Sequence, residues 1–473
     1  MKHKDVTVKI ICYNLDFSHR LAKKCNAGLL LASTTNHGVD FMASKQRPER
    51  REALRALSVS FLGNLLQWYD FALFVYFAVV LSEVFYSGES SMADRIMKVL
   101  LIYGVGFIGR PVGGLLLGPL GDKYGRKFLL MLTIALMAIG TLAIGLTPGF
   151  AIMGVWAQIL LVIGRFLQGI SVGGEWAAAT LFMVEWAPPN RRGLWGSFQQ
   201  MSIACGFLVA SLFAAWCTSY WDPETLYAWG WRIPFLIGGL ALAPFALFMR
   251  NQVEETPVHR KAAAAAAAAP EQQVELPKPW GGALRTVAIG ASWMAAYYTF
   301  MAYTPTWAKS YATGLGGLYA ANALWANVIT LVFFIIMIPL LGLLSDIVGR
   351  KPLMVLGSVL FGIAPWFIYQ WMLNAASFPV FVAFQCCLAF MVALFSGPAP
   401  TALSEMFHPR QRAAWMAPYY SLAAALGGGF APAISAWLNA NGGALAHSWY
   451  VVAWAVFVFV ATVTMRESAF DHE

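Results

Sequence analysis

The chain has 473 residues, of which 59% are hydrophobic and 12% charged, about half the charged fraction of an ordinary soluble domain. A water-soluble core cannot bury so much apolar side chain, so the composition excludes a soluble protein and predicts an all-α protein that crosses the membrane repeatedly. The net charge of +9 does not indicate nucleic-acid binding, because the basic residues lie in short loops between apolar runs, where they act as topology signals.

Residues 1–55 form a polar and basic N-terminal segment that we expect in the cytoplasm. Its apolar stretch is interrupted by Tyr13, Asn14 and Asp16, which is not typical of a signal-peptide core. Met42 begins a second basic leader directly before the first long apolar run. We therefore expect translation to start at Met42, with residues 1–41 untranslated or disordered.

Twelve apolar runs long enough to cross the bilayer follow, six on each side of a polar connection. Their expected bounds are 57–82, 96–120, 128–147, 151–175, 193–218, 231–249, 284–308, 320–344, 352–373, 378–402, 413–437 and 447–465. The first six predict an N-terminal bundle over 56–250, and the last six a C-terminal bundle over 283–466. Residues 251–282, with eight consecutive alanines, are predicted to form a cytoplasmic linker, and 467–473 a cytoplasmic tail.

Lysine and arginine are concentrated on one side of the predicted membrane. They occupy the N-terminal segment, the linker and the turns that follow the second, fourth, eighth and tenth runs, whereas the other side carries Arg95, Lys98 and Lys309. The positive-inside rule therefore predicts a multi-pass protein of a bacterial-type inner (plasma) membrane with both termini in the cytoplasm.

Two charged motifs recur at nearly the same offset. Gly118-Pro-Leu-Gly-Asp-Lys-Tyr-Gly-Arg-Lys127 follows the second run and Gly342-Leu-Leu-Ser-Asp-Ile-Val-Gly-Arg-Lys351 the eighth, which places Asp122 and Asp346 224 positions apart. Glu185 after the fourth run and Glu405 after the tenth are 220 apart. The agreement indicates duplication of a six-helix unit, and parallel repeats of this kind build transporters with the substrate site between the halves.

The pattern Gly-x-x-x-Asp-[Arg/Lys]-x-Gly-Arg-[Arg/Lys] in these turns resembles that of the major facilitator superfamily. Residues 63–71, 109–114, 164–176 and 255–257 resemble the metabolite:proton symporter family, which includes proline/betaine, citrate, α-ketoglutarate, dicarboxylate and shikimate carriers. The resemblance covers about 50–465 and implies a major facilitator fold of 12 transmembrane helices in two six-helix bundles. In one departure, Gln67 stands where relatives usually carry glutamate, which favours Asp70 as proton carrier and leaves a uniporter or exchanger open.

Three ionisable residues lie near the middle of predicted spans: Asp70 in the first, Arg110 in the second and Arg165 in the fourth. A charge at the bilayer centre costs about 2.5 to 3.5 kcal/mol on insertion scales, so each needs a partner or a water-filled cavity. One acid and two arginines leave a positive excess, which predicts a wet chamber between the bundles for an anionic or carboxylate-bearing substrate. A helix-locking ion pair between Asp70 and one arginine is the structural alternative.

Two further residues are candidates for the site. Glu175, near one end of the fourth span, is a second possible proton carrier, although a structural hydrogen bond beside the helix-packing glycines Gly173 and Gly174 would explain it equally well. Spans seven to twelve carry aromatic and hydroxyl residues in place of deep charge, and Tyr303 is predicted to help shape the pocket. The segment 303–307, Tyr-Thr-Pro-Thr-Trp, is similar to that of citrate-type members and favours di- or tricarboxylates over proline/betaine-type osmolytes.

The charged motifs also predict a cytoplasmic gate. Ion pairs at the membrane–water boundary form and break without burying a lone charge, and each contributes about 1 kcal/mol or less when exposed. Topology signalling explains the cations but not the acid at the matching position of both halves. The predicted gate residues are Asp122, Arg126, Glu185 and Arg192 in the first half, and Asp346, Arg350, Glu405 and Arg412 in the second.

The sequence as a whole predicts a secondary active transporter that couples inward proton flow to uptake of a small carboxylate or zwitterion by alternating access. We expect it to work as a monomer in the lipid bilayer, without nucleic acid, metal or other cofactor, because its histidines and six cysteines form no ligand cluster. An exporter or exchanger of the same fold remains open. A membrane sensor would need a soluble output domain, for which the tail after Arg466 is too short. An enzyme would need a cluster of metal-binding or nucleophilic residues, and the histidines of this sequence form no such cluster.

Overall fold

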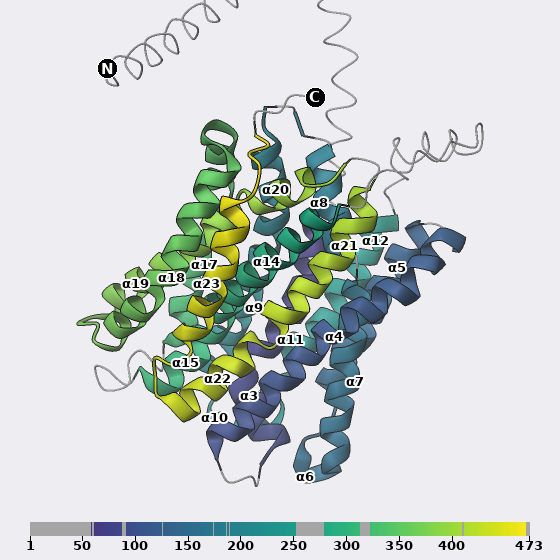
Figure 1. The fold of residues 1–473 in the computed structure, drawn as a ribbon. Coiled ribbons are helices and arrows are strands. Elements are labelled where there is room, and N and C mark those ends of the chain that lie inside the picture. The colour runs from purple at the N-terminus through teal and green to yellow at the C-terminus, as the bar shows by residue number, and fades with distance from the viewer. Residues whose placement is uncertain are drawn as a thin grey trace, which may run out of the picture. The chain divides into compact units, whose positions relative to one another are not determined.

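The computed structural model describes residues 58, 61–87, 91–124, 126–173, 175–185, 187–188, 190–251, 279–312, 322–408 and 411–469. All of them belong to one compact unit, Leu57–Glu473, which is distinct from Met1–Ala56. The predicted N-terminal segment 1–55 and most of the predicted linker lie outside the described residues. The described part contains α- and π-helices and no strand (Figure 1).

Each of the twelve predicted spans corresponds to a helix or a series of helices. Among the described residues, eight helices are long and apolar enough to cross a membrane, or nine if the bent pair Phe61–Tyr76 and Ala78–Phe85 is one span. The shorter or interrupted spans are α5 (Arg126–Leu146), α23 (Ser448–Val463) and the series α14 (Trp280–Tyr297), η3 (Tyr298–Tyr303) and α15 (Thr304–Tyr311). In the first half the elements are Phe61–Tyr76, α3 (Ala78–Phe85), α4 (Met92–Tyr124), α5 (Arg126–Leu146), α6 (Phe150–Met153), α7 (Val155–Val172), α8 (Glu175–Glu185), α9 (Arg192–Tyr220), α10 (Pro223–Thr225), η1 (Leu226–Gly230), α11 (Arg232–Ile237), η2 (Gly238–Leu242) and α12 (Ala243–Asn251).

The second half repeats this arrangement of long apolar helices. Its elements are α14 (Trp280–Tyr297), η3 (Tyr298–Tyr303), α15 (Thr304–Tyr311), α17 (Ala323–Val348), α18 (Arg350–Leu373), α19 (Phe378–Ser396), α20 (Ala399–Glu405), α21 (Arg412–Ala423), η4 (Ala424–Gly429), α22 (Ala431–Gly442) and α23 (Ser448–Val463). The η elements are π-helical. A π turn leaves the usual i→i−4 bonding pattern and often marks a functional position in a helix.

The fourth and tenth spans are interrupted at matching positions. The break between α7 and α8 begins at Gly173, and the break between α19 and α20 begins at Gly397. These glycines are 224 positions apart, the same offset that separates Asp122 from Asp346. The shared break is a structural counterpart of the duplication predicted from the charged motifs.

Spans two and four pack with their backbones in contact. A Cβ at Gly169 would overlap the carbonyl group of Gly106, and a Cβ at Gly173 would overlap the carbonyl oxygen of Arg110. Larger residues would push α4 and α7 apart, since only glycine lets two helix backbones approach this closely. The predicted packing role of Gly173 is confirmed. The contact also places the backbone of Arg110 directly beside Gly173, at the end of α7.

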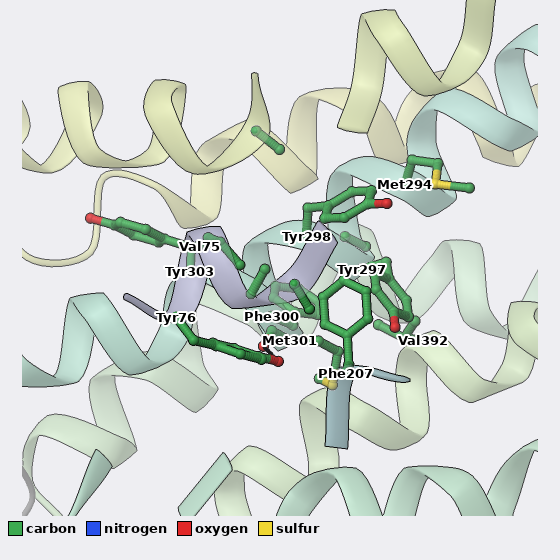
Figure 2. Close-up of a cluster of buried hydrophobic side chains, with 14 of the residues drawn as sticks. Val75, Tyr76, Phe207, Met294, Tyr297, Tyr298, Phe300, Met301, Tyr303 and Val392 are labelled. Atoms are coloured by element: carbon green, nitrogen blue, oxygen red, sulfur yellow. Dashed lines mark hydrogen bonds between the residues drawn. The ribbon is translucent and has the colours of Figure 1, made fainter. Parts of the chain in front are cut away.

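The two halves meet along several helix pairs. α9 lies along α17, and α4 lies against η4 and α22, while α8 contacts α21 (Figure 1). Aromatic side chains fill the middle of this interface. Figure 2 shows Phe207 of α9 between Tyr76 of the first span and Tyr297 of α14, with ring centroids 6.0 Å and 5.3 Å away. The Tyr76 hydroxyl also donates to the Met301 carbonyl at 3.0 Å, which joins the first span to η3.

Candidate functional site

A small cavity lies between the two halves at the level of these aromatic rings. The first span and α9 contribute Trp68, Gln200 and Ile203, and the seventh span contributes Trp293, Met294, Tyr297 and Tyr298. Its volume is about 10 Å³, close to the minimum that one water molecule needs. The wet chamber expected from the sequence is therefore closed in this structure to about the size of one water molecule.

Arg110 lies beside this cavity on α4, surrounded by aromatic rings. Its guanidinium carbon is 4.0 Å from the ring centroid of Phe107 and 5.0 Å from that of Trp68. The Phe107 ring also packs edge-on against the ring of Tyr298 from the other half, with centroids 5.2 Å apart. Among the described residues, the buried Nε and Nη2 atoms have no hydrogen-bond partner. Because an unmet buried charge is costly, these two donors are candidates to bind an anionic group.

Arg165 of α7 contacts the same Phe71 ring as Arg110. Its guanidinium carbon is 4.1 Å from the centroid of that ring, while the Arg110 carbon is 5.1 Å from the same centroid. Arg165 Nη1 donates to Gln168 Oε1 at 2.7 Å, and Nη2 donates to the Tyr103 carbonyl at 3.4 Å. Phe71 thus contacts both arginines, of which Arg165 is hydrogen-bonded within its own bundle.

Asp70 is buried inside the N-terminal half, and neither guanidinium forms a direct ion pair with it among the described side chains. Its Oδ1 atom has no hydrogen-bond partner among the described residues and lies against the backbone of Gly238 in η2. The Thr141 side chain of α5 lies against the same glycine, and its Oγ1 atom accepts from Gln168 Nε2 at 2.8 Å. Gln168 therefore connects Arg165 to Thr141, which lies beside Asp70.

The other predicted site residues do not join this group. Gln67 is half-buried, and its Oε1 atom is buried without a partner. Glu175 is the first residue of α8, and its side chain lies outside the described part. Tyr303 accepts a hydrogen bond from Asn439 Nδ2 at 3.2 Å and points away from Tyr298 (Figure 2). It does not line the cavity between the halves.

On the side predicted to be cytoplasmic, Asp346 joins the two halves. Its Oδ1 and Oδ2 atoms accept from the backbone N–H groups of Gly193 and Leu194 at 2.8 and 2.9 Å. Those N–H groups belong to the first turn of α9, where the helix dipole favours a negative charge. Arg350 then pairs with Asp346 at 3.1 Å and with Glu405 at 3.3 Å. Three predicted gate residues of the second half thus form one network, and its contact with the first half is to backbone.

The C-terminal segment closes this network from the other end. Glu467 accepts from the backbone N–H groups of Arg350 and Lys351 at 3.0 and 2.8 Å, which caps the start of α18. Ser468 donates to Glu405 at 2.6 Å. Gly349 precedes the cap with φ of 103°, in the left-handed region that glycine adopts most readily.

The remaining gate residues are only partly described. The side chains of Asp122 and Arg126 lie outside the described part, although their backbones belong to α4 and α5. Glu185 is exposed at the end of α8. Arg192 begins α9, and its carbonyl accepts from Thr401 Oγ1 at 2.9 Å. Burial and the neighbouring Arg192 lower the pKa of Arg412, which donates from Nε to the Phe407 carbonyl at 3.0 Å.

The sequence matches two family models along most of its length. Residues 56–272 match the family described as sugar (and other) transporter, and residues 317–467 match the major facilitator superfamily. The proline/betaine transporter of Salmonella typhimurium is 30% identical over 428 residues, which cover 88% of this chain and 84% of the relative. The citrate-proton symporter of Klebsiella pneumoniae is 32% identical over 375 residues, which cover 79% of this chain and 82% of the relative. The chain belongs to the metabolite:proton symporter family of the major facilitator superfamily.

Membership in this family makes the chain a multi-pass membrane transporter and not an enzyme. The xylose transporter XylE from E. coli, in a partially occluded inward open conformation, has a TM-score of 0.70 to this structure. The match covers 89% of this chain and 100% of that one at 21% identity, so it bears on the fold alone. The predicted all-α major facilitator fold, with 12 transmembrane helices in two six-helix bundles, is confirmed.

Sequence reasoning missed several residues that this transporter places at the site. Trp68, Gln200 and Trp293 line the cavity, while Gln168 connects Arg165 to Thr141, which lies beside Asp70. Polar residues in the middle of predicted spans were the available signal, because an uncharged amide or hydroxyl in a span also needs a partner. The sequence does not say which helix provides that partner.

Proposed function

We propose that the chain is a proton-coupled symporter that carries a small carboxylate-bearing zwitterion into the cell by alternating access. The observation that supports this most directly is Arg110, whose buried Nε and Nη2 donors lack acceptors beside a cavity between the two bundles. A substrate carboxylate would accept from both nitrogens, because the planar guanidinium matches a carboxylate in a bidentate pair.

The surroundings of Arg110 favour a zwitterion over a di- or tricarboxylate, which reverses the preference drawn from residues 303–307. The cavity lining contains four aromatic side chains and no charged residue. Aromatic faces attract a substituted ammonium group, whereas a second or third carboxylate would need further cations there. Tyr303, part of the citrate-like segment, bonds Asn439 instead of lining the cavity. A citrate-type substrate remains the second candidate, since one relative is named a citrate-proton symporter.

Asp70 is the proposed proton carrier. It is a buried carboxyl group near the centre of the first span, and an oxygen without a partner offers a place for the proton. Proton binding would remove its charge and so change its interaction with Arg165, which biases the equilibrium between inward-facing and outward-facing states. The proposed gate of Asp346, Arg350 and Glu405 would keep the cytoplasmic side shut until then.

The proposed setting is a bacterial inner membrane. The bundles 56–250 and 283–466 would act together as a monomer in the lipid bilayer, with the tail 1–55, the linker 251–282 and the tail 467–473 in the cytoplasm. The Lys/Arg asymmetry of the loops supports this orientation.

Uptake into vesicles containing the purified protein tests the proposal. Labelled proline, glycine betaine, citrate, α-ketoglutarate, succinate and shikimate are offered with and without an inward proton gradient. We expect saturable, gradient-dependent uptake of proline or glycine betaine, with acidification of the lumen. Arg110→Lys should raise KM about tenfold, because lysine keeps the charge but loses the bidentate geometry. Uptake of citrate alone would favour the second candidate, and uptake without proton movement would indicate an exchanger or uniporter.

A further inference from the structure

The side chain of Gln200 is a buried amide at the cavity between the two halves. Gln200 belongs to α9 and lines the cavity together with Trp68 of the first span and Tyr298 of η3. It is 3% exposed, and its Oε1 atom has no hydrogen-bond partner among the described residues. Because a buried amide oxygen without a donor costs free energy, this atom is a candidate acceptor for a ligand in the cavity.

The contact between α9 and the first span holds this amide in place. Asn64 of the first span donates from Nδ2 to Ser202 Oγ of α9 at 2.6 Å, and both side chains are buried. Trp68 lies one helical turn beyond Asn64, and the centroid of its ring is 5.0 Å from the guanidinium carbon of Arg110. Trp68 thus contacts Arg110 and also lines the cavity that Gln200 lines.

Arg110 and Gln200 have opposite hydrogen-bonding needs. The buried Nε and Nη2 atoms of Arg110 can only donate, whereas the amide oxygen of Gln200 can only accept. Tyr297 also lines the cavity with a hydroxyl that lacks a partner among the described residues, but a hydroxyl can donate or accept and so requires neither. The described residues that line the cavity include no acid, so the amide oxygen is the acceptor there that demands a donor.

We propose that Gln200 is a specificity-determining residue that accepts a hydrogen bond from an N–H group of the substrate's ammonium. The inference rests on the proposed function, in which Arg110 binds the carboxylate of a zwitterion. The ammonium group then lies on a neighbouring carbon, among the aromatic rings of the lining. A primary or secondary ammonium donates to the Gln200 oxygen, whereas a quaternary ammonium has no N–H group and leaves that oxygen unpaired.

The aromatic rings and the amide have different parts in this recognition. Aromatic faces attract any ammonium group, whatever the number of its N–H groups. A buried acceptor distinguishes among such groups, because a site built to bind an N–H group rejects an analogue that lacks it. The transporter should therefore prefer zwitterions with a primary or secondary ammonium to their fully N-methylated analogues.

Proline, N-methylproline and N,N-dimethylproline test the proposal, since they share one ring and carry two, one and no N–H groups on the charged nitrogen. Each competes with labelled proline for uptake into vesicles that contain the full-length protein. In the wild type we expect N,N-dimethylproline to compete about tenfold more weakly than proline. Gln200→Leu keeps the approximate size of the side chain and removes the acceptor. It should weaken competition by proline about tenfold and leave competition by N,N-dimethylproline nearly unchanged, so the ratio falls to about one.

Two further variants separate the hydrogen bond from a general effect on the bundle. Gln199→Leu is a matched control, because Gln199 is a buried amide on the same helix that does not line the cavity. It should keep the wild-type ratio. Gln200→Glu presents an oxygen to the substrate whichever way the group is turned, so it should still discriminate against N,N-dimethylproline.

A wild-type ratio in Gln200→Leu would overturn the proposal, because the size of the added methyl groups would then explain the selection. Equal competition by all three compounds in the wild type would overturn it too. Uptake of glycine betaine without uptake of proline would leave the proposed function standing and remove the role of Gln200. Uptake of proline without proton movement, with the ratio lost in Gln200→Leu, would do the reverse. If citrate alone were taken up, both would be wrong.

Discussion

Asp346→Asn is expected to shift the transporter towards states that are open on the cytoplasmic side. The two bonds from the α9 backbone to Asp346 cross between the halves, so they must break when the halves rock apart on that side. The ion pair between Asp346 and Arg350 lies within the second half and is kept in both states. Only the cross-half bonds therefore bias the equilibrium.

The size of the effect follows from what asparagine can replace. The carboxylate accepts one N–H at each oxygen, 2.8 and 2.9 Å away, whereas asparagine has one acceptor oxygen and no charge. Bonds to a charged group contribute about 1.5–3 kcal/mol each and neutral bonds about 1 kcal/mol. Asp346→Asn should therefore destabilise the closed state relative to the open state by about 2 kcal/mol. This difference lowers the ratio of closed to open protein about 30-fold.

Distances between spin labels on the two halves measure this ratio. Asn190 and Ile347 are exposed on the first and second halves near the gate, and each can be replaced by a labelled cysteine. We expect Asp346→Asn to increase the population of longer distances, while Glu224→Gln, an exposed acid on the opposite side, should not. An unchanged distance distribution in Asp346→Asn would refute the reasoning.

Other substitutions test neighbouring contacts. In Gly193→Ala the new Cβ would lie 2.8 Å from Asp346 Oδ1, so the same spin-label measurement should show more open protein, and an unchanged distribution would contradict the tight contact. Glu467→Gln removes the charge that caps α18 and should lower the free energy of unfolding of the purified protein by about 1 kcal/mol. The measurement is the melting temperature, and an unchanged value would argue against the cap. Gly169→Ala forces a Cβ into the carbonyl group of Gly106 and should cost about 1–3 kcal/mol, read from the melting temperature; a wild-type value would show that α4 and α7 can separate freely.

The fold was largely predictable because its signals are local. Hydropathy over about 20 residues identified the spans, and the glycine and acid positions of the two motifs indicated the duplication. The bounds were less accurate where charge enters a helix: the second span was expected at 96–120, but α4 runs from Met92 to Tyr124. Helices of membrane proteins extend beyond the hydrocarbon, so charged residues such as Asp94 do not end them.

The candidate site was predictable only in part because its pairings are not local. The cost of burying charge singled out Asp70, Arg110 and Arg165. It could not show that Arg165 binds Gln168 and that Gln168 binds Thr141 beside Asp70, because these four residues come from three different spans. Sequence position likewise cannot show that Asp346 binds backbone N–H groups, which every residue except proline has. For the same reason the sequence does not show that Tyr303 accepts a hydrogen bond from Asn439, and its role in the pocket stays a prediction.

Tyr298 connects the proposed substrate site to the movement of the two halves. Its ring packs against Phe107 of α4 with centroids 5.2 Å apart, and its backbone begins η3 of the second half. Tyr298 also lines the cavity, whose volume of about 10 Å³ admits no substrate unless the surrounding rings move. Displacing Tyr298 would therefore release η3 from α4. The ring cannot withdraw towards η4, where a Cβ at Gly428 would already lie 2.8 Å from it. Substrate entry must then shift η3 itself, which makes binding inseparable from a change at the interface between the bundles.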